Sequence, residues 1–267
     1  MIANRDLAPE RQTHLGEIVQ QRGAMRVEEL TELLGVSPAT IRRDLEALED
    51  AGQLRRVHGG AISVQGRMAE PLFDDKTSIA ATEKRAIAVE AAKLINTDDT
   101  IYLDGGSTVL ELAMLLKTRN DITVVTNSLR AAAELSTSDL ALILVGGELR
   151  KRSQTTVGAL TRKIIDELHI DIAFMGTIGL TLQEGMTTTS PAEAYTKELI
   201  MAHSNRTVLL VDSAKIGKIS FARAGDLKEL DTLITDRGID TTVRKQLRKC
   251  VNLIEAESSV RSDTNCV

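Results

Sequence analysis

Aromatic residues are scarce in this sequence of 267 residues, which contains two Tyr, three Phe and no Trp. Proteins that bind single-stranded nucleic acid stack the bases on aromatic side chains, so the composition argues against that class. A run of eighteen apolar residues, the length of a membrane-spanning helix, is also missing. Residues 1–12 lack the basic, apolar and small-residue segments of a secretion signal. We therefore expect a cytoplasmic protein without a membrane partner.

Cysteines and nucleotide-binding motifs are scarce too. Only Cys250 and Cys266 are present, and neither belongs to a CxxC or Cys/His cluster. This spacing indicates neither a disulfide framework nor a zinc site. The fingerprints GxGxxG and GxxxxGKS/T are missing, so no motif supports a dinucleotide or nucleoside triphosphate site. We expect neither a metal nor a cofactor.

The charge of the chain is unevenly distributed. A formal net charge of -5 would by itself count against a nucleic-acid partner. One short stretch nevertheless contains four arginines and a histidine, which are Arg42, Arg43, Arg55, Arg56 and His58. Local charge matters more than the sum for an anionic partner. This stretch is therefore the candidate nucleic-acid surface.

Residues 11–50 have the hydrophobic spacing of three short helices. The first covers 11–22, and the second covers 27–34 and stops at a glycine. Ser37 is a natural N-cap and Pro38 a natural first residue for the third helix. Three helices of these lengths, with a Gly-Val-Ser turn between the last two, have the outline of a helix-turn-helix.

The exposed face of the third helix has residue types that suit a major groove. Small side chains allow close approach, arginine can bind guanine or phosphate, and a helix N-terminus attracts phosphate. The segment after this helix alternates apolar and basic residues up to Gly59 and Gly60, which predicts a two-stranded wing. The predicted DNA-contacting residues are Ser37, Ala39, Thr40, Arg42, Arg43, Arg55, Arg56 and His58.

The acidic residues of the third helix, Asp44 and those at 46–50, are expected to point away from DNA or to pair with these arginines. A solvated amphipathic helix with i,i+4 ion pairs would show a similar charge pattern. The conjunction of three helices, the Ser-Pro start and the basic wing favours DNA binding.

The pattern changes after residue 62. Residues 63–77 are polar, contain Gly66 and Pro71 and show no periodicity, which predicts a linker. Apolar strands then alternate with helices, as in a doubly wound α/β fold with a buried parallel sheet. The sequence thus predicts a winged helix-turn-helix domain over 7–62, the linker, an α/β domain over 78–255 and a disordered tail over 256–267.

Ligands of such sheets bind beyond the carboxyl ends of the strands. The predicted strand ends carry glycine, hydroxyl and charged residues, including Lys215 as a cation. Glycines let backbone amides approach an anion, and hydroxyls can contact a ligand, so the composition suits a phosphorylated, hydroxyl-rich small molecule. Each of these loop sequences, taken alone, is also common in ordinary turns between a strand and a helix. The candidate loops are 104–108, 126–128, 146–148, 176–179 and 212–215.

The segment VEELTELLGVSPATIRRDLEALEDAGQLRRVHGGA, residues 27–61, resembles the N-terminal domain of the DeoR family of bacterial transcriptional regulators. It has the family's S-x-x-T-I-R-R-D-L core and the final GG of the wing. The motifs D-G-G-S-T, V-T-N-S, G-G-E-L-R, F-M-G-T, G-M-T-T-T and D-S-A-K resemble the C-terminal sensor domain of that family. The sensor domain is similar in fold to ribose-5-phosphate isomerase.

The resemblance implies that the second domain binds a phosphorylated sugar or sugar derivative as inducer and mediates oligomerisation. Gly105, Gly106, Ser107, Thr108, Gly146 and Gly147 would hold phosphate or hydroxyl groups, and Asp104, Asn127, Glu193, Asp212 and Lys215 would provide polar contacts. The expected function is repression of a carbohydrate uptake or catabolism operon, with release from operator DNA by a sugar phosphate. We expect at least a homodimer, because one small DNA-binding domain offers too little contact for specific binding. The resemblance to the family implies tetramers as well.

An enzyme is the main alternative. In a sugar-phosphate isomerase with an appended DNA-binding domain, Asp104 or Glu193 would act as base and Lys215 as electrophile. The sequence shows no complete catalytic constellation, and a fused DNA-binding domain favours binding without turnover, so we expect no catalytic residues. A third alternative is an architectural DNA-binding protein without a ligand, but it assigns no role to the strand-end loops. The sequence does not distinguish repression from activation.

Overall fold

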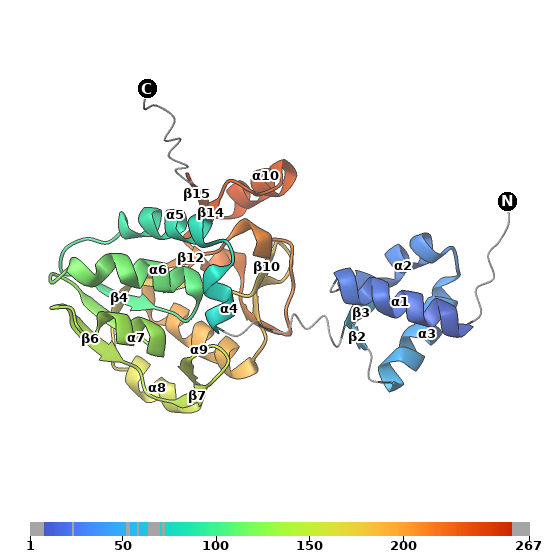
Figure 1. Ribbon diagram of the computed structural model, residues 1–267, viewed down its shortest axis with the longest axis horizontal. Helices are drawn as coiled ribbons and strands as arrows, with labels where there is room; N and C mark the ends of the chain where they lie inside the picture. The colour runs from blue at the N-terminus through green and yellow to red at the C-terminus, as the bar shows by residue number, and fades with distance from the viewer. Residues whose placement is uncertain are drawn as a thin grey trace, which may run out of the picture. The chain divides into compact units, whose positions relative to one another are not determined.

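The computed structural model describes residues 8–22, 24–51, 54–57, 59–63, 70 and 73–257. The chain divides into two compact units, residues 1–70 and 71–267 (Figure 1). Within the described residues, no helix has both the length and the apolar character needed to cross a membrane.

The first unit begins with the three predicted helices, α1 (Ala8–Arg22), α2 (Val27–Leu34) and α3 (Pro38–Asp50). Helix α2 ends at Gly35, whose φ of 64° lies in the left-handed region that glycine adopts without strain. Ser37 caps α3 and Pro38 is its first residue, as the sequence predicts. The helices enclose a core in which Leu15, Leu30 and Ile41 are fully buried.

The wing of the first unit has one strand more than predicted. Strands β1 (Ala24–Arg26), β2 (Leu54–Val57) and β3 (Gly60–Ser63) form an antiparallel sheet in the order β1-β3-β2. The prediction of a two-stranded wing missed β1, because three residues between two helices give no readable alternation. Glycine is required at position 60, where β3 pairs with β1, since a Cβ there would lie 2.3 Å from the Met25 carbonyl oxygen.

The second unit is built on seven parallel strands in the order β15-β14-β12-β9-β4-β5-β6. These are β4 (Thr100–Leu103), β5 (Thr123–Thr126), β6 (Ala141–Leu144), β9 (Ile170–Met175), β12 (Ser204–Leu210), β14 (Thr232–Asp236) and β15 (Asn252–Ala256). From β4 the chain first adds strands on one side and then, from β9, on the other. The sheet therefore has a topological switch point between β4 and β9, where ligands of such folds bind.

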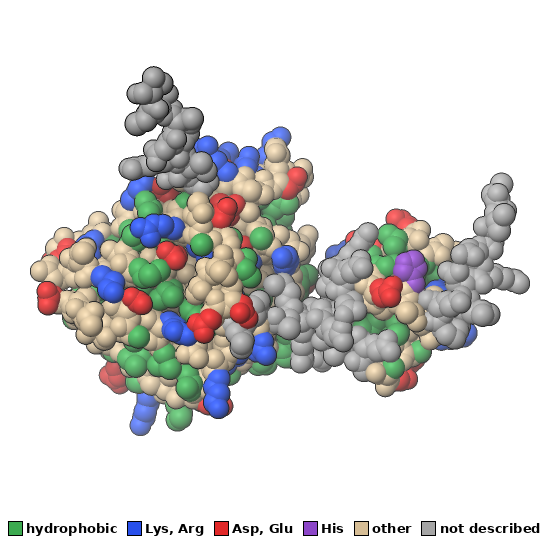
Figure 2. Space-filling view, in the orientation of Figure 1, with side chains coloured by type: hydrophobic (Ala, Val, Ile, Leu, Met, Phe, Trp, Pro, Cys, Tyr) green, Lys and Arg blue, Asp and Glu red, His purple; other side chains and the backbone are tan. Residues whose placement is uncertain are grey.

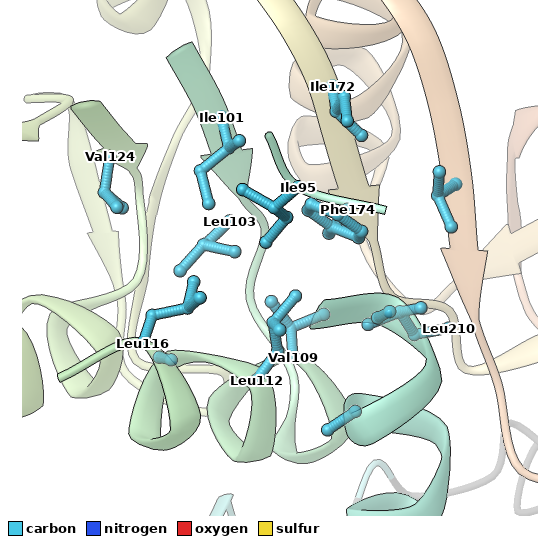
Figure 3. Close-up of a cluster of buried hydrophobic side chains, with 14 of the residues drawn as sticks. Ile95, Ile101, Leu103, Val109, Leu112, Leu116, Val124, Ile172, Phe174 and Leu210 are labelled. Atoms are coloured by element: carbon cyan, nitrogen blue, oxygen red, sulfur yellow. The ribbon is translucent and has the colours of Figure 1, made fainter. Parts of the chain in front are cut away.

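Helices cover both faces of this sheet, which confirms the doubly wound fold. Helices α5 (Ala81–Ala92), α6 (Ser107–Leu115) and α7 (Leu129–Leu135) share one core, in which Val109 and Leu112 of α6 pack against Ile101, Leu103 and Phe174 of the sheet (Figure 3). Helices α8 (Ala159–Ile165), α9 (Pro191–Ala202) and α10 (Thr241–Cys250) share the core of the opposite face.

Several short elements of the second unit were not predicted. Strands β7 (Glu148–Arg150) and β8 (Thr155–Val157) form a hairpin, and β10 (Gly179–Thr181), β11 (Gly185–Thr188) and β13 (Ala222–Gly225) form a small antiparallel sheet. Single 3-10 turns lie at Leu116–Thr118, Ser213–Lys215 and Leu227–Glu229. Helix α10 was missed because its side chains are mostly polar and only Leu247 is buried.

Both predicted flanks of the second domain overlap ordered elements. Helix α4 (Phe73–Ser78) overlaps the end of the predicted linker 63–77, and Phe73 is buried. The predicted tail 256–267 starts inside β15, where Ala256 is buried, and its residues 258–267 lie outside the described part of the chain. The sequence predicted the strand β15 from VNLIEA and set the start of the tail one residue too early, whereas the six residues of α4 are too few to show a helical periodicity.

Candidate DNA-binding helix and ligand-binding edge

Helix α3 presents its predicted DNA-contacting face to solvent. The Ser37 hydroxyl oxygen accepts a hydrogen bond from the Thr40 amide at 3.2 Å, and the two hydroxyl oxygens lie 2.9 Å apart. Arg42 and Arg43 are exposed, and neither has an ion-pair partner in the part of the chain that the structure describes. Ile41 and the rest of the apolar stripe are buried on the other side. The two guanidinium groups are therefore available to an anion.

Asp44 is buried against α1, where it pairs with Arg11 and not with the arginines of α3. Its carboxylate accepts hydrogen bonds from Arg11 Nε at 2.6 Å, Arg11 Nη2 at 3.1 Å and Gln12 Nε2 at 3.0 Å. Only 3% of the residue is exposed. Asp44 therefore lies on the buried side of α3, away from the predicted DNA-contacting face, as one of the two expected arrangements has it, and its carboxylate joins α1 to α3.

The basic residues of the wing differ in their surroundings. Arg56 lies within 3.4 Å of Glu46 and 3.8 Å of Glu49, so the acids of α3 pair with a wing arginine, one of the two expected arrangements. Arg55 belongs to β2, but its side chain, like the whole of His58, lies outside the described part of the chain.

A buried ion pair occupies the switch point of the parallel sheet. Asp104 follows β4, and its carboxylate pairs with the Lys197 ammonium of α9 and accepts a hydrogen bond from the Gly176 amide at 3.0 Å. Lys197 also donates to the Gly176 carbonyl at 2.9 Å, so the pair joins the ends of β4 and β9. The sequence predicted Asp104 but missed Lys197, one helical turn after the predicted Glu193.

The N-terminus of α6 carries two buried hydroxyls without a partner. Ser107 is 3% and Thr108 2% exposed, and neither hydroxyl makes a hydrogen bond within the described residues. Gly106 precedes the helix with a φ of 136°, a conformation that favours glycine. A Cβ at Gly105 would lie 2.2 Å from the Thr155 methyl group, so the hairpin β7–β8 packs closely over this loop.

Asn127 ties the end of β5 to the same hairpin. Its Nδ2 donates to the Thr156 carbonyl at 3.0 Å, while its buried Oδ1 has no partner among the described residues. Gly146 and Gly147 lie farther along the edge, where a Cβ would meet Ile164 and Thr161 of α8. The predicted phosphate contacts of these two glycines remain predictions.

Lysines gather around Asp212, which follows β12. The Lys215 ammonium lies 3.5 Å from the Asp212 carboxylate. Burial lowers the pKa of Lys215, and nearby Lys76 and Lys197 lower it further against the opposing effect of Asp212. Burial also lowers the pKa of Lys84 to about 8, with Lys215 contributing. The lysine cluster, defined as Lys76, Lys84, Lys197 and Lys215, therefore concentrates positive charge at the carboxyl edge of the parallel sheet, the candidate ligand-binding edge.

Asp236 supports this edge from the end of β14. Its carboxylate accepts hydrogen bonds from the Ser213 amide and hydroxyl, both at 2.7 Å, and from the Gly238 amide at 2.9 Å. Burial alone would raise its pKa, but these hydrogen bonds outweigh burial and lower the pKa of Asp236. The carboxylate thus fixes the loop that carries Lys215.

Glu193 also makes polar contacts with neighbouring side chains. Its carboxylate accepts a hydrogen bond from the Thr188 hydroxyl at 2.6 Å and lies 3.3 Å from Arg150 Nη1. Arg150 Nη2 donates to the Thr189 hydroxyl at 2.9 Å. This contact connects the hairpin β7–β8 to the start of α9.

The structure therefore places Asp104, Ser107, Thr108, Asn127, Asp212 and Lys215 at the carboxyl edge of the sheet. The sequence missed Lys84, although Lys84, Ile87, Ala88 and Ala91 form the buried stripe of α5 and a lysine in such a stripe is a usable signal. Among the described residues, no three His, Cys, Asp or Glu side chains are arranged to hold a metal ion.

Comparisons with known proteins agree with this architecture. Residues 11–67 match the DeoR-like helix-turn-helix domain, and residues 79–237 match the DeoR C terminal sensor domain. The chain is 37% identical over 242 residues to the HTH-type transcriptional regulator YulB of Bacillus subtilis, covering 90% of this chain and 93% of the relative. It is 34% identical over 250 residues to the lactose phosphotransferase system repressor of Staphylococcus epidermidis, covering 92% of this chain and 98% of the relative.

Among solved structures, ribose 5-phosphate isomerase A of Methanocaldococcus jannaschii overlaps 51% of this chain and 55% of its own, with 20% identity and a TM-score of 0.39. The two family matches and the relatives at more than 30% identity cover the helix-turn-helix, the sheet and the ligand-binding edge. The chain belongs to the DeoR family of DNA-binding transcriptional regulators.

Proposed function

We propose that this protein represses an operon for carbohydrate uptake or catabolism and leaves its operator when a phosphorylated sugar or sugar derivative binds. The name of the staphylococcal relative, a lactose phosphotransferase system repressor, supports the class of genes. Family membership supports DNA binding and a small-molecule effector.

One observation carries the choice of a phosphorylated ligand. The hydroxyls of Ser107 and Thr108, which have no partner among the described residues, lie at the N-terminus of α6, where backbone amides and the helix dipole favour an anion. Lys84 and Lys215 add cations whose pKa values are lowered mainly by burial and further by neighbouring lysines. A phosphate would give the hydroxyls acceptors and offset the mutual repulsion of the ammonium groups.

The other polar groups suit the hydroxyl-rich part of such a ligand. The free Oδ1 of Asn127 can accept from a sugar hydroxyl, and Asp104 lies at the switch point where the ligand is expected. Asp104 and Glu193, the candidate bases of the isomerase alternative, already pair with Lys197 and Arg150. These pairings support a site that binds without turnover.

Operator binding by more than one subunit is part of the proposal. The recognition face of a single α3 offers few base contacts, and two-fold symmetric operators match two-fold symmetric proteins. A homodimer or tetramer would also let effectors on several subunits act together. A shift from almost fully bound to almost fully released needs about 5 kcal/mol of differential affinity.

The test is binding of the purified protein to the DNA upstream of its own gene and neighbouring genes, with and without a panel of pentose and hexose phosphates. We expect tight binding that one compound or one close group of compounds weakens, and no turnover of any compound. Binding that is indifferent to all of them would contradict the sensor proposal, and turnover would favour the isomerase.

A further inference from the structure

Helix α4 is the first described helix of the second unit and follows the segment that leads from the DNA-binding unit. It packs against α6, beside the ligand-binding edge (Figure 1). With only six residues, it cannot be stable through its own hydrogen bonds. Its position therefore depends on the side chains that hold it.

One end of α4 is held by Arg130. The Phe73 ring is buried, with the Arg130 guanidinium carbon 5.6 Å from the ring centroid and the Lys76 ammonium 5.7 Å from it. Arg130 Nη2 also donates to Asp74 Oδ1 at 2.5 Å. Arg130 lies in the first turn of α7, so this anchor comes from the helix that directly follows the loop with Asn127.

The other end of α4 is held by Lys84. Its buried ammonium donates to the Lys76 carbonyl in the last turn of α4 and to the Ile79 carbonyl, 2.5 Å away, just beyond the helix. The same ammonium lies in the electrostatic field of Lys215 and Asp212. Lys84 therefore belongs both to the anchor of α4 and to the lysine cluster of the ligand-binding edge.

These two roles compete. A carbonyl oxygen is a neutral acceptor, whereas a phosphate is a charged acceptor that forms stronger, charge-assisted hydrogen bonds with an ammonium. A phosphate bound between Lys215 and Lys84 would draw the Lys84 ammonium away from the two carbonyls. The last turn of α4 would then lose its only charged donor among the described residues.

We propose that Lys84 transmits effector binding to the DNA-binding unit by exchanging the carbonyl groups of α4 for the anionic group of the ligand, which releases α4. This inference rests on the proposed function, because it needs an anionic effector at the ligand-binding edge. Released α4 lengthens the connection between the two units, which lowers the effective concentration of the second DNA-binding unit on an operator.

Hydrogen exchange of the full chain, followed by mass spectrometry with and without inorganic phosphate, tests the proposal. We expect phosphate to protect residues 104–110 and to make amides in 73–80 exchange roughly fivefold faster or more, the lower end of typical coupling. In Lys84→Met, residues 73–80 should exchange fast from the start and not respond to phosphate. Lys93→Met, the same change at the C-cap of α5, where the side chain is 62% exposed, should behave as the wild type.

Phe73→Ala loosens α4 without removing a group from the ligand-binding edge, and it covers the case in which Lys84→Met does not fold. It should exchange fast at 73–80 without phosphate and bind phosphate at least as tightly as the wild type, because coupling is reciprocal. Protection of 104–110 with unchanged exchange at 73–80 would overturn the role of Lys84 and leave the proposed function intact. Absence of any protection at 104–110 would overturn both.

Discussion

The Lys197 ammonium pairs with the Asp104 carboxylate at the point where the parallel sheet reverses its strand order. Both side chains are more than nine-tenths buried, and both also bond to the backbone of Gly176. This pair lies at the centre of the candidate ligand-binding edge and joins α9 to the ends of β4 and β9.

Lys197→Met should therefore destabilise the second unit by about 3–5 kcal/mol, because it leaves the Asp104 carboxylate buried without its cation. The free energy of unfolding in urea measures this loss. Lys163→Met, at an exposed position of α8, should change it by less than about 0.5 kcal/mol. The double change Asp104→Asn with Lys197→Met should recover part of the loss, and failure to recover any would contradict the pairing as its cause.

Ser107→Ala should leave the stability nearly unchanged, within about 0.5 kcal/mol, because the hydroxyl that it removes makes no hydrogen bond in the described residues. The same change should weaken phosphate binding about tenfold, as expected for loss of a hydrogen bond to a charged group. Urea unfolding measures the change in stability, and calorimetric titration with phosphate measures the change in affinity.

Thr126→Val is the control for Ser107→Ala, because it removes a buried hydroxyl that does make hydrogen bonds. Its buried hydroxyl donates to the Leu103 carbonyl at 2.6 Å and accepts from the Ser128 amide at 3.0 Å. Removing it should cost about 1–3 kcal/mol of stability, since two backbone groups lose a partner. Equal stability losses in the two variants would show that Ser107 has a structural partner.

Arg42→Ala with Arg43→Ala should weaken operator binding and reduce the slope of log K against log salt by about 2 if both guanidinium groups contact phosphates. The control removes two exposed cations elsewhere. Lys and Arg side chains gather over α10 (Figure 2), and Lys245→Ala with Lys249→Ala changes the net charge equally. An unchanged salt slope in the first variant would remove α3 from the DNA interface.

The pH dependence of stability should depend on Lys84. Its pKa is about 8 in the folded chain and 10.5 in the unfolded chain, so between these values the unfolded state binds more protons. The free energy of unfolding of the wild type relative to Lys84→Met should therefore rise as the pH increases from about 8 to 10.5. Lys76, Lys215, Asp212 and Glu111 surround Lys84 and shape this curve.

Phosphate affinity should move in the opposite direction to this stability difference. It should fall as the pH rises through 8, because Lys84 loses its charge, and the fall should be smaller in Lys84→Met. Identical pH profiles for the two proteins, measured by calorimetric titration, would place the bound anion away from Lys84.

The sequence predicts elements with clear periodicity and strong start signals. The Ser37-Pro38 start of α3 and the central apolar strands are of this kind, and motif positions such as Asp104 and Lys215 follow from the strand ends. Partners across long sequence distances were not predictable. In the sequence, Lys84 looks like any lysine of an amphipathic helix, and only the structure shows its contact with the Ile79 carbonyl beyond α4. Asp44 likewise looks like a solvated acid, and only the structure shows Arg11 beside it.

The contact of Asp44 with Arg11 and Gln12 fixes the rotation of α3 about its axis from the buried side of the helix. Ala39, Arg42 and Arg43 take no part in that contact, and their side chains are exposed. If these exposed residues contact the operator as predicted, the fold of the DNA-binding unit and its choice of DNA sequence are encoded by separate residues. After gene duplication, a daughter protein could then acquire a new operator through substitutions at the exposed positions while it keeps an unaltered fold.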